Sequence, residues 1–329
     1  CYNLNMFTYI IKRLLGMFPL LLGIITISFM VIHLAPGKPS VLTEAMNPKV
    51  SSEVRERLNK LYGLDRPLYI QYFDWCRKII TLDFGASFID GRPVIRKISE
   101  RLPLTVFINA ASLFLILFLG IIIGLKCAAQ AGSFYDHCMS LLVFIGFAMP
   151  GFWLSLLLMD FFGLKLRWLP ISGITSLDFE YFTFWGKAGD LLRHLALPLF
   201  VSCFGGLAGI SRYIRQNTLE ILKTPYIRAA RAKGLTHSAV LIKHVLPNTL
   251  LPVVTILGLS IPGLIGGSVI FESIFALPGV GRLFYEAVMA RDYPMIMAEL
   301  VIGAVLTLLG NFLADIAYSY VDPRIRHKR

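Results

Sequence analysis

One stretch of the chain combines residue types and spacing that suit binding to a partner. Residues 226–254 read YIRAARAKGLTHSAVLIKHVLPNTLLPVV, which predicts a short basic helix before Gly234 and a second helix after it. Arg228, Arg231 and Lys233 supply charges that can pair with carboxylates or phosphates. Three interpretations compete for this stretch: DNA recognition, attraction to anionic lipid, and docking to a soluble protein.

A second segment offers charged residues at a membrane boundary. The sequence FESIFALPGVGRL, residues 271–283, predicts a turn after Pro278 that is flanked by Gly279 and Gly281. The charged residues available there for ion pairs are Glu272, Arg282, Arg291 and Asp292. Two interpretations stay open, an outer gate for a transported molecule and a structural re-entrant loop.

Motifs for catalysis, nucleotide binding and metal binding are missing from the sequence. Neither G-x-x-x-x-G-K-[ST] nor H-E-x-x-H occurs, the histidines lack metal-ligand spacing, and the five cysteines form no C-x-x-C pair. An intramembrane serine protease would need a serine facing a base, and His33 and His194 have no evident partner. The sequence predicts a protein that is not an enzyme and that holds no cofactor or metal of its own.

The composition places these residues in a membrane protein. Of the 329 residues, 56% are hydrophobic and only 16% are charged, with a mean hydropathy of +0.68. Soluble domains carry about 25% charged residues. The net charge of +12 would suit nucleic acid or an anionic membrane surface, so the position of the charges decides between them.

Six stretches are long and apolar enough to cross about 30 Å of hydrocarbon, which takes about 20 residues. They are 14–35, 104–125, 139–162, 195–210, 250–270 and 296–320. The fourth is short and contains Gly205 and Gly206, so it is expected to extend toward Arg212. The first is too long for the apolar core of a signal peptide and is expected to be retained. The predicted fold is an all-α membrane protein with six transmembrane helices.

The distribution of Lys and Arg over the short loops predicts the orientation. Six spans put both termini and the loops after the second and fourth spans on one side, which carries most of the short-loop basic residues and is therefore cytoplasmic. The predicted organisation is a cytoplasmic tail 1–13, a first helix 14–35, an external loop or cap 36–102, a five-helix core 103–320 with a cytoplasmic loop 212–249, and a basic cytoplasmic tail 321–329.

The long external segment is expected to fold into a small cap. Residues 51–63 place apolar side chains on one helical face, and Gly63 supplies a C-terminal stop. Residues 67–80, PLYIQYFDWCRKII, are rich in aromatics and suit a helix at the outer edge of the membrane.

The basic stretch has helix-end signals on both sides of its glycine. Thr224 is expected at the N-cap with Pro225 in the first turn, where its missing N–H has no cost. Gly234 can take the left-handed conformation that ends the first helix. Thr236 or Ser238 can cap the second helix.

The stretch therefore predicts a short, rigid knob held at both ends by membrane helices. Pro247 is expected to stop its second helix. Ala229, Ala230 and Ala232 leave room for another backbone to approach. The residues expected to dock a partner are Tyr226, Arg228, Ala229, Ala230, Arg231, Lys233, Gly234 and Pro247.

Shape and charge together favour one of the three interpretations. A basic loop resting on lipid headgroups fits the charge but not the tight capping. A DNA reader fits the geometry loosely, but the segment lies between spans with no linker to reach a groove. Docking to a soluble protein fits both.

The basic stretch and its neighbours resemble a known family. RAARAKG, nine further residues and HVLP are similar to the EAA loop of ABC-importer permeases, which reads Glu-Ala-Ala, three residues, Gly, nine residues and Ile-x-Leu-Pro. Arg228 stands where that pattern has Glu, and His244 where it has Ile. The dipeptide/oligopeptide/nickel branch is similar in carrying Arg-x-Ala-Arg-Ala-Lys-Gly. The stretches LAPGKP, AMPGFWLSLLL, FESIFALPGVGRL and VDPRIRHKR are also similar to that branch, and they occur along the chain in the same order as there.

The resemblance implies a type I importer permease fold with several partners. These are a homologous second permease, two cytosolic ABC ATPases that bind ATP and Mg, and an extracytoplasmic solute-binding protein, in a bacterial or archaeal plasma membrane. Residues 225–233 would be the coupling helix that sits in a cleft of the ATPase. Arg228 in place of Glu leaves open which ATPase side chains it meets. No nucleic-acid partner is expected.

The expected function is half of the translocation path of an ATP-driven importer of dipeptides or oligopeptides. Import of nickel or a metal chelate is the main alternative, because the same branch serves both. An ion-coupled secondary carrier would transport without any ATPase. A membrane-anchored regulator would bind nucleic acid in a salt-dependent way.

Overall fold

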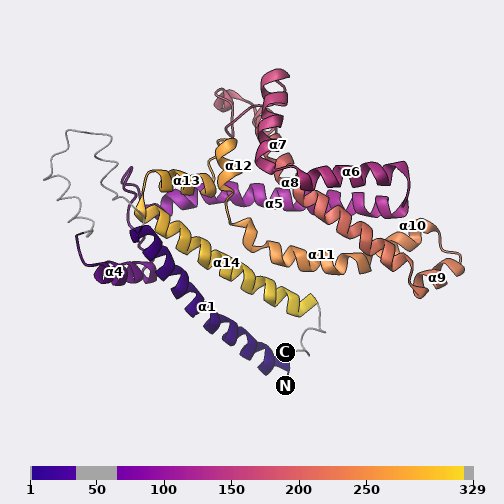
Figure 1. The fold of residues 1–329 in the computed structure, drawn as a ribbon, viewed down its shortest axis with the longest axis horizontal. Coiled ribbons are helices and arrows are strands. Elements are labelled where there is room, and N and C mark those ends of the chain that lie inside the picture. The colour runs from indigo at the N-terminus through magenta and orange to yellow at the C-terminus, as the bar shows by residue number, and fades with distance from the viewer. Residues whose placement is uncertain (1, 35–64, 322–329) are drawn as a thin grey trace.

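The computed structural model describes residues 2–34 and 65–321, and its secondary structure there is almost wholly helical (Figure 1). The α-helices are α1 (Tyr2–Leu34), α4 (Leu68–Ile80), α5 (Val94–Ala129), α6 (Phe134–Ala148), α7 (Gly151–Leu158), α8 (Phe184–Leu222), α9 (Pro225–Ala232), α10 (His237–Val240), α11 (Leu246–Ser260), α12 (Val269–Ile274), α13 (Val280–Met289) and α14 (Tyr293–Val321). The π-helical turns are η1 (Met159–Lys165) and η3 (Leu241–Val245), and the 3₁₀ turns are η2 (Phe179–Tyr181) and η4 (Pro262–Leu264). The expected all-α architecture is confirmed.

Within residues 2–34 and 65–321, four helices are long and apolar enough to cross a membrane unaided. They are Ile11–Leu34 of α1, α5, α8 and Tyr293–Ala314 of α14, and the bent pair of α6 with α7–η1 can supply a fifth crossing. Along the chain, α1, α6 and α11 run away from the end of the molecule that carries α9 and α10, whereas α5, α8 and α14 run toward it (Figure 1). The directions alternate, as six consecutive crossings require.

The third predicted span, 139–162, is not one helix but is divided at Pro150. α6 and α7–η1 meet at an angle of 105°. Met149 and Pro150 at the break are extended, with ψ of 119° and 130°. Proline causes this, because its ring lacks an N–H and pushes the residue before it out of the helical region. The turn brings the start of α7 against α12: a Cβ on Gly151 would lie 2.8 Å from the ring of Phe271.

The fifth span is also shorter than the predicted helix 250–270. α11 ends at Ser260 and is followed by the 3₁₀ turn Pro262–Leu264. Its 15 residues extend about 22 Å, less than the roughly 30 Å of hydrocarbon. Asn109 of α5 donates to backbone carbonyls of the 263–266 segment at 3.0–3.3 Å. This amide partners carbonyls that the end of the helix would otherwise leave unpaired inside the membrane.

α5 and α8 pack closely because glycines line their contact. A Cβ on Gly124 of α5 would lie 2.6 Å from the backbone oxygen of Ser211 in α8. A Cβ on Gly206 of α8 would lie 2.5 Å from the side chain of Ile116 in α5. Small residues let membrane helices approach at backbone distance, so this pair forms the centre of the bundle (Figure 1).

Both of these helices begin earlier than predicted. α5 starts at Val94 instead of 104, and α8 starts at Phe184 instead of 195. The added turns of α5 are polar, and Arg96 pairs with Glu100 one turn later at 3.2 Å. Such polar turns are not recognised as part of a span from apolar composition, although charged pairs four residues apart stabilise a helix.

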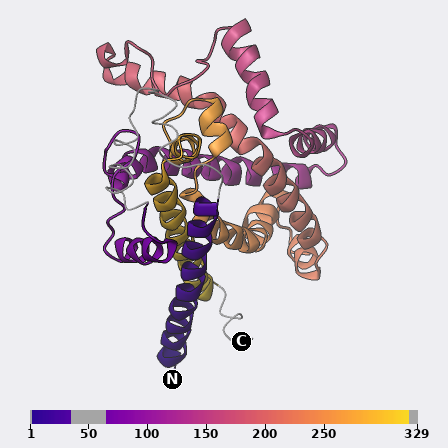
Figure 2. The same ribbon diagram turned by 60° about the vertical axis from the view of Figure 1, so that its left-hand side comes forward.

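α1, α4 and α14 form a second group of helices beside this centre (Figure 2). Their shared core contains buried Ile25, Phe29, Trp75 and Val301. α4 is held to α1 by Thr26 Oγ1 and Tyr72 Oη, 2.8 Å apart. The aromatic helix predicted within 67–80 is confirmed as α4, whereas the helix predicted over 51–63 lies outside the described residues.

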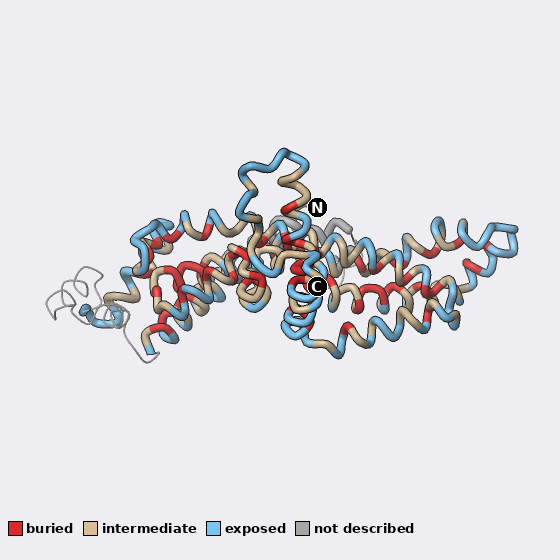
Figure 3. Tube along the Cα trace, turned by 90° about the horizontal axis from the view of Figure 1, so that it is seen from above, coloured by how far each residue is buried: buried red, intermediate tan, exposed pale blue. Residues whose placement is uncertain are grey.

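Much apolar surface of the spanning helices is left uncovered by the chain itself. Only 22% of the apolar window of α1 is buried, and Leu15, Phe18 and Ile27 are 63–70% exposed. Exposed positions run along the outer faces of the helices in Figure 3. A bilayer or another membrane chain must cover these faces, because apolar surfaces of this size are rarely left in contact with water.

Candidate functional site: a basic knob and a buried carboxylate

α9 forms a knob at the far end of α8, where the surface is largely exposed (Figures 1 and 3). Ile227 and Ala230 are its buried residues, at 0% and 8% exposure. They pack against Val240 and Val245, both 0% exposed, from the returning segment. A small hydrophobic core of its own therefore holds the knob in place.

The ends of α9 follow most of the expected helix signals. Pro225 stands in the first turn, and Gly234 has a φ of +82°. Thr236 caps α10 by accepting from the N–H of Ala239 at 3.3 Å. Thr224 occupies the N-cap position as expected, but its hydroxyl donates to the carbonyl of Ile221 at 2.5 Å and makes no capping hydrogen bond to α9.

Pro247 does not stop the second helix, contrary to the sequence-based prediction. The chain passes from α10 through the π turn Leu241–Val245 into α11, whose first turn contains Pro247. The N–H of Leu246 donates to the carbonyl of Leu241, five residues back. The wider turn shifts the carbonyls just before the proline, which relieves the clash of its ring with a regular helical ladder.

Tyr226 and Asn248 tie the knob to this π turn. The Tyr226 hydroxyl donates to the carbonyl of His244 at 3.3 Å. The Asn248 amide donates to the same carbonyl at 2.8 Å and to the Tyr226 oxygen at 3.1 Å. The knob, the π turn and the start of α11 are thus connected by polar as well as apolar contacts.

The exposed face of the knob is basic. Arg228, Arg231 and Lys233 are exposed, and Arg228 Nη2 lies 3.4 Å from the carbonyl oxygen of Lys223. Ala229 is exposed, but Ala230 is buried, so its predicted place on the contact surface is wrong. The reason is helical geometry: Ala230 lies three residues after Ile227 and shares its inward face.

Glu272 is the buried centre of the segment expected to form an outer gate. The carboxylate is 5% exposed; it accepts from Thr105 Oγ1 at 3.0 Å and from the backbone N–H of Arg282 at 2.9 Å. The Thr105 oxygen accepts in turn from the N–H of Val280 at 2.9 Å. One carboxylate therefore joins α12, α13 and α5.

Glycines make this packing possible. A Cβ on Gly279 would lie 2.4 Å from the Glu272 carboxyl group, and one on Gly281 would lie 2.7 Å from the backbone of Ser268. Gly267 lies outside the predicted gate segment 271–283, and a Cβ on it would lie 2.2 Å from the nitrogen of Gly281. Glycine is required at these three positions because there is no room for a Cβ, and not because the backbone has a positive φ.

The ion pairs expected among Glu272, Arg282, Arg291 and Asp292 are not the contacts that form. Arg282 Nε pairs with Glu286 at 2.8 Å on the exposed side of α13. The Asp292 carboxylate is 0% exposed and accepts from the hydroxyl of Ser87 and from a backbone N–H. The two carboxylates point inward onto neutral donors while Arg282 points outward, so opposite charges do not meet.

The same Ser87 connects the gate segment to the turn before α5. Lys97 Nζ donates to Ser87 Oγ at 3.1 Å and pairs with Asp90 at 2.9 Å. Burial raises the pKa of Asp90, but hydrogen bonds from Lys97 and from the Arg92 N–H outweigh it and hold the pKa below its usual value. Asp90 is therefore an ionised anchor at neutral pH.

Glu299 is a carboxylate beside the gate that the motif did not include. It is 8% exposed in α14, and neither of its carboxylate oxygens has a hydrogen-bond partner among the described residues. It lines a cavity of about 190 Å³ together with Gly267, Val280 and Gly281. Its one signal in the sequence was an acidic residue at the end of an apolar span.

His194 has partners that the sequence did not reveal. Its Nε2 lies 3.3 Å from Ser176 Oγ, and the same hydroxyl donates to Asp190 at 2.5 Å. A catalytic triad needs the carboxylate on His Nδ1, but here Nδ1 lies 3.1 Å from the backbone oxygen of Gly173. The cluster therefore fastens the loop before α8 and does not activate the serine.

Comparison with known proteins connects these features to one family. Residues 116–327 match the model described as "Binding-protein-dependent transport system inner membrane component". The chain belongs to this family. Residues 6–109 match the model of the corresponding N-terminal region, "Binding-prot-dependent transport system membrane comp, N-term". The expected kinship with ABC-importer permeases and the multi-pass inner-membrane fold are confirmed, and the family is one of transport proteins.

Several relatives align over nearly the whole of this family member. The "Oligopeptide transport system permease protein AppB" of Bacillus subtilis (strain 168) is 44% identical over 323 residues, which cover 98% of this chain and 100% of the relative. The "Dipeptide transport system permease protein DppB" of Alkalihalophilus pseudofirmus is 33% identical, with 98% and 100% covered. The "Glutathione transport system permease protein GsiC" of Salmonella typhi is 33% identical, also with 98% and 100% covered.

Proposed function

We propose that this family member is the permease subunit of an ATP-driven importer of peptides. It would form half of the translocation path, with a homologous second permease forming the other half. The names of three relatives that align end to end, for oligopeptides, dipeptides and glutathione, support peptides over nickel or a metal chelate. The uncovered apolar faces of α1 and α5 leave room for a second membrane chain beside this one.

The observation that carries the coupling role is the construction of α9. It is a short helix with a buried Ile227, a positive φ at Gly234 and a basic exposed face, fixed between two membrane helices. A helix held this way moves with α8 and α11 as one lever. We infer that it sits in a cleft of a cytosolic ATPase lined by acidic or carbonyl oxygens, and that two such ATPases bind the ATP and Mg.

The orientation follows from the same assignment. If α9 meets an ATPase, its end of the molecule is cytoplasmic, along with residues 1–13, 212–249 and 321–329. The segment 36–102 and the α12–α13 region then face the outside of a bacterial or archaeal plasma membrane, where a solute-binding protein delivers the peptide. Glu272 would hold the outer gate closed by joining α5, α12 and α13.

Paired charge reversal tests the ATPase contact. Arg228→Glu with Arg231→Glu should release the ATPases during purification, because both side chains are exposed on the face of α9 that points away from its small core. Arg193→Glu, an exposed arginine near the start of α8, is the matched control and should retain them. Retention of the ATPases by the double variant at the level of the control would refute docking through α9.

Competitive uptake tests the substrate. Proteoliposomes of the full complex with labelled dipeptide should lose uptake to unlabelled peptide and not to Ni²⁺. Displacement by Ni²⁺ alone would establish the metal alternative. Uptake by the permease without any ATPase would establish a secondary carrier.

A further inference from the structure

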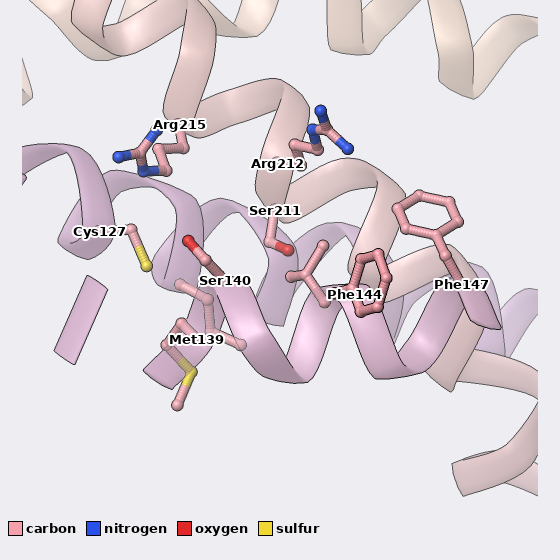
Figure 4. Close-up of a pocket in the computed structure, with 10 residues that line it drawn as sticks. Cys127, Met139, Ser140, Phe144, Phe147, Ser211, Arg212 and Arg215 are labelled. Atoms are coloured by element: carbon pink, nitrogen blue, oxygen red, sulfur yellow. The ribbon is translucent and has the colours of Figure 1, made fainter. Parts of the chain in front are cut away.

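A groove between α5, α6 and α8 combines arginines with an apolar wall. Its volume is about 530 Å³, and its lining comes from all three helices: Ile123 and Cys127 of α5, Met139, Ser140, Val143, Phe144 and Phe147 of α6, and Ser211, Arg212 and Arg215 of α8. In Figure 4 the two arginines extend from α8 on one side, and the apolar side chains of α6 lie along the other. The mechanism proposed above uses none of these residues.

One arginine of the groove is held in a fixed orientation. Arg215 donates from Nε and Nη2 to the two carboxylate oxygens of Asp136, at 2.6 and 2.7 Å. Asp136 is 3% exposed and also accepts from the N–H of Gly132 at 2.9 Å. A guanidinium carries five N–H donors, so Arg215 keeps donors for another group. Asp136 is thus a positioning residue for Arg215.

The other charges at this end are not balanced by acids of the groove. Arg212 is exposed at the rim, and Lys126 lies nearby at the end of α5, 4.4 Å over the ring of Tyr135. Arg215 and Asp136 cancel each other, which leaves two positive charges beside an opening in the membrane-crossing part of the chain. An anionic group complements them.

The opposite end of the groove suits hydrocarbon. Phe144 and Phe147 are 69% and 58% exposed, and they follow Ser140 along α6 over roughly 10 Å. A free phosphate would leave this apolar wall uncovered, whereas an acyl chain would cover it. Basic pockets between membrane helices are known binding places for the headgroups of anionic lipids.

We propose that this groove binds one anionic phospholipid, with its phosphate held by the charge of Arg212 and the remaining N–H donors of Arg215, and with an acyl chain along Phe144 and Phe147. The bound lipid would join α5, α6 and α8 at the end of the bundle from which α9 extends. The inference requires only that these helices cross a membrane. It therefore does not depend on which substrate is transported.

Native mass spectrometry of the purified complex tests the proposal. Phosphatidylglycerol should remain bound to the wild type where phosphatidylcholine does not. Arg212→Gln should weaken its retention about fivefold, the effect of one charge near an anionic headgroup. Arg193→Gln, on the same helix but far from the groove, should bind as the wild type does. Equal retention of the two lipids, or equal loss in both variants, would overturn the proposal.

Photo-crosslinking locates the acyl chain. Phosphatidylglycerol with a diazirine in one acyl chain should label peptides of α6 around Phe144 and Phe147 in the wild type, and less so in Arg212→Gln. Labelling elsewhere would refute the site. Crosslinking of Phe144→Cys to the second permease would overturn the proposal, because protein and not lipid would then fill the groove.

Discussion

Gly234→Val is expected to uncouple the permease while leaving it folded in the membrane. Gly234 has a φ of +82°, and no atom lies within 4 Å of the position of a Cβ. A Cβ at this position therefore meets no clash, and the expected effect of the substitution comes from the backbone conformation. An L-residue there costs roughly 1–2 kcal/mol, and a β-branched one costs more, up to about 3 kcal/mol.

That strain is comparable with the energy that holds α9 in place. Full burial of an isoleucine side chain contributes about 1.5–3 kcal/mol, and Ile227 is the one large side chain of α9 with 0% exposure. Each 1.4 kcal/mol changes the ratio of the docked to the undocked arrangement tenfold. Valine can thus shift α9 toward an undocked arrangement, whereas the core of the membrane helices is untouched.

A graded series separates backbone strain from side-chain size. Asn tolerates the left-handed region better than Ala, and Ala better than Val, so activity should fall in the order Gly, Asn, Ala, Val at position 234. Gly189→Val is the control, because Gly189 also has open space around its Cβ but lies within α8 without a positive φ. Valine is no worse than glycine in a helix interior.

The assay is binding-protein-stimulated ATP hydrolysis and peptide uptake by the reconstituted complex, with ATPase co-purification measured in parallel. Gly234→Val should lower both activities, by up to about tenfold where the strain exceeds the energy that holds α9 in place by about 1.4 kcal/mol. Gly189→Val should keep them. Wild-type activity in Gly234→Val, or the same loss in Gly234→Asn, would refute the argument from positive φ.

Three further predictions concern the rest of the molecule. Glu272→Gln should alter substrate-stimulated uptake with assembly intact, because it removes the charge that joins α5, α12 and α13; unchanged uptake would count against a gating role. Asp136→Asn should lower the thermal stability of the purified complex by about 1–3 kcal/mol, since Arg215 loses its ionised partner; an unchanged melting temperature would mean that water replaces the contact. Ile89→Cys and Ser238→Cys, both exposed, should react with an impermeant maleimide from opposite faces of the membrane, and labelling from one face would contradict six crossings.

The motifs that depend on local chemistry were the ones that could be predicted from the sequence. The positive φ of Gly234, Pro225 in the first turn and the Thr236 cap each follow from backbone preferences of single residues. The existence of the membrane helices followed from apolar composition, because the bilayer demands it. The ends of these helices did not follow from apolar composition, because Pro150 breaks the third span and the fifth helix ends at Ser260.

What the tertiary structure alone decided is which side chains meet. The sequence identifies Glu272 as a charged residue but not its contacts. Thr105 lies 167 residues from it along the chain, and Arg282, whose N–H it accepts from, lies 10 residues away. Ala230 resembled its neighbours in the sequence, and only the contacts with Val240 and Val245 showed which face of α9 points inward. The groove at Arg212 and Arg215 exists because α6 returns beside α8. A sequence specifies local conformation through each residue's own energetics, whereas contacts between distant segments depend on how whole helices pack together.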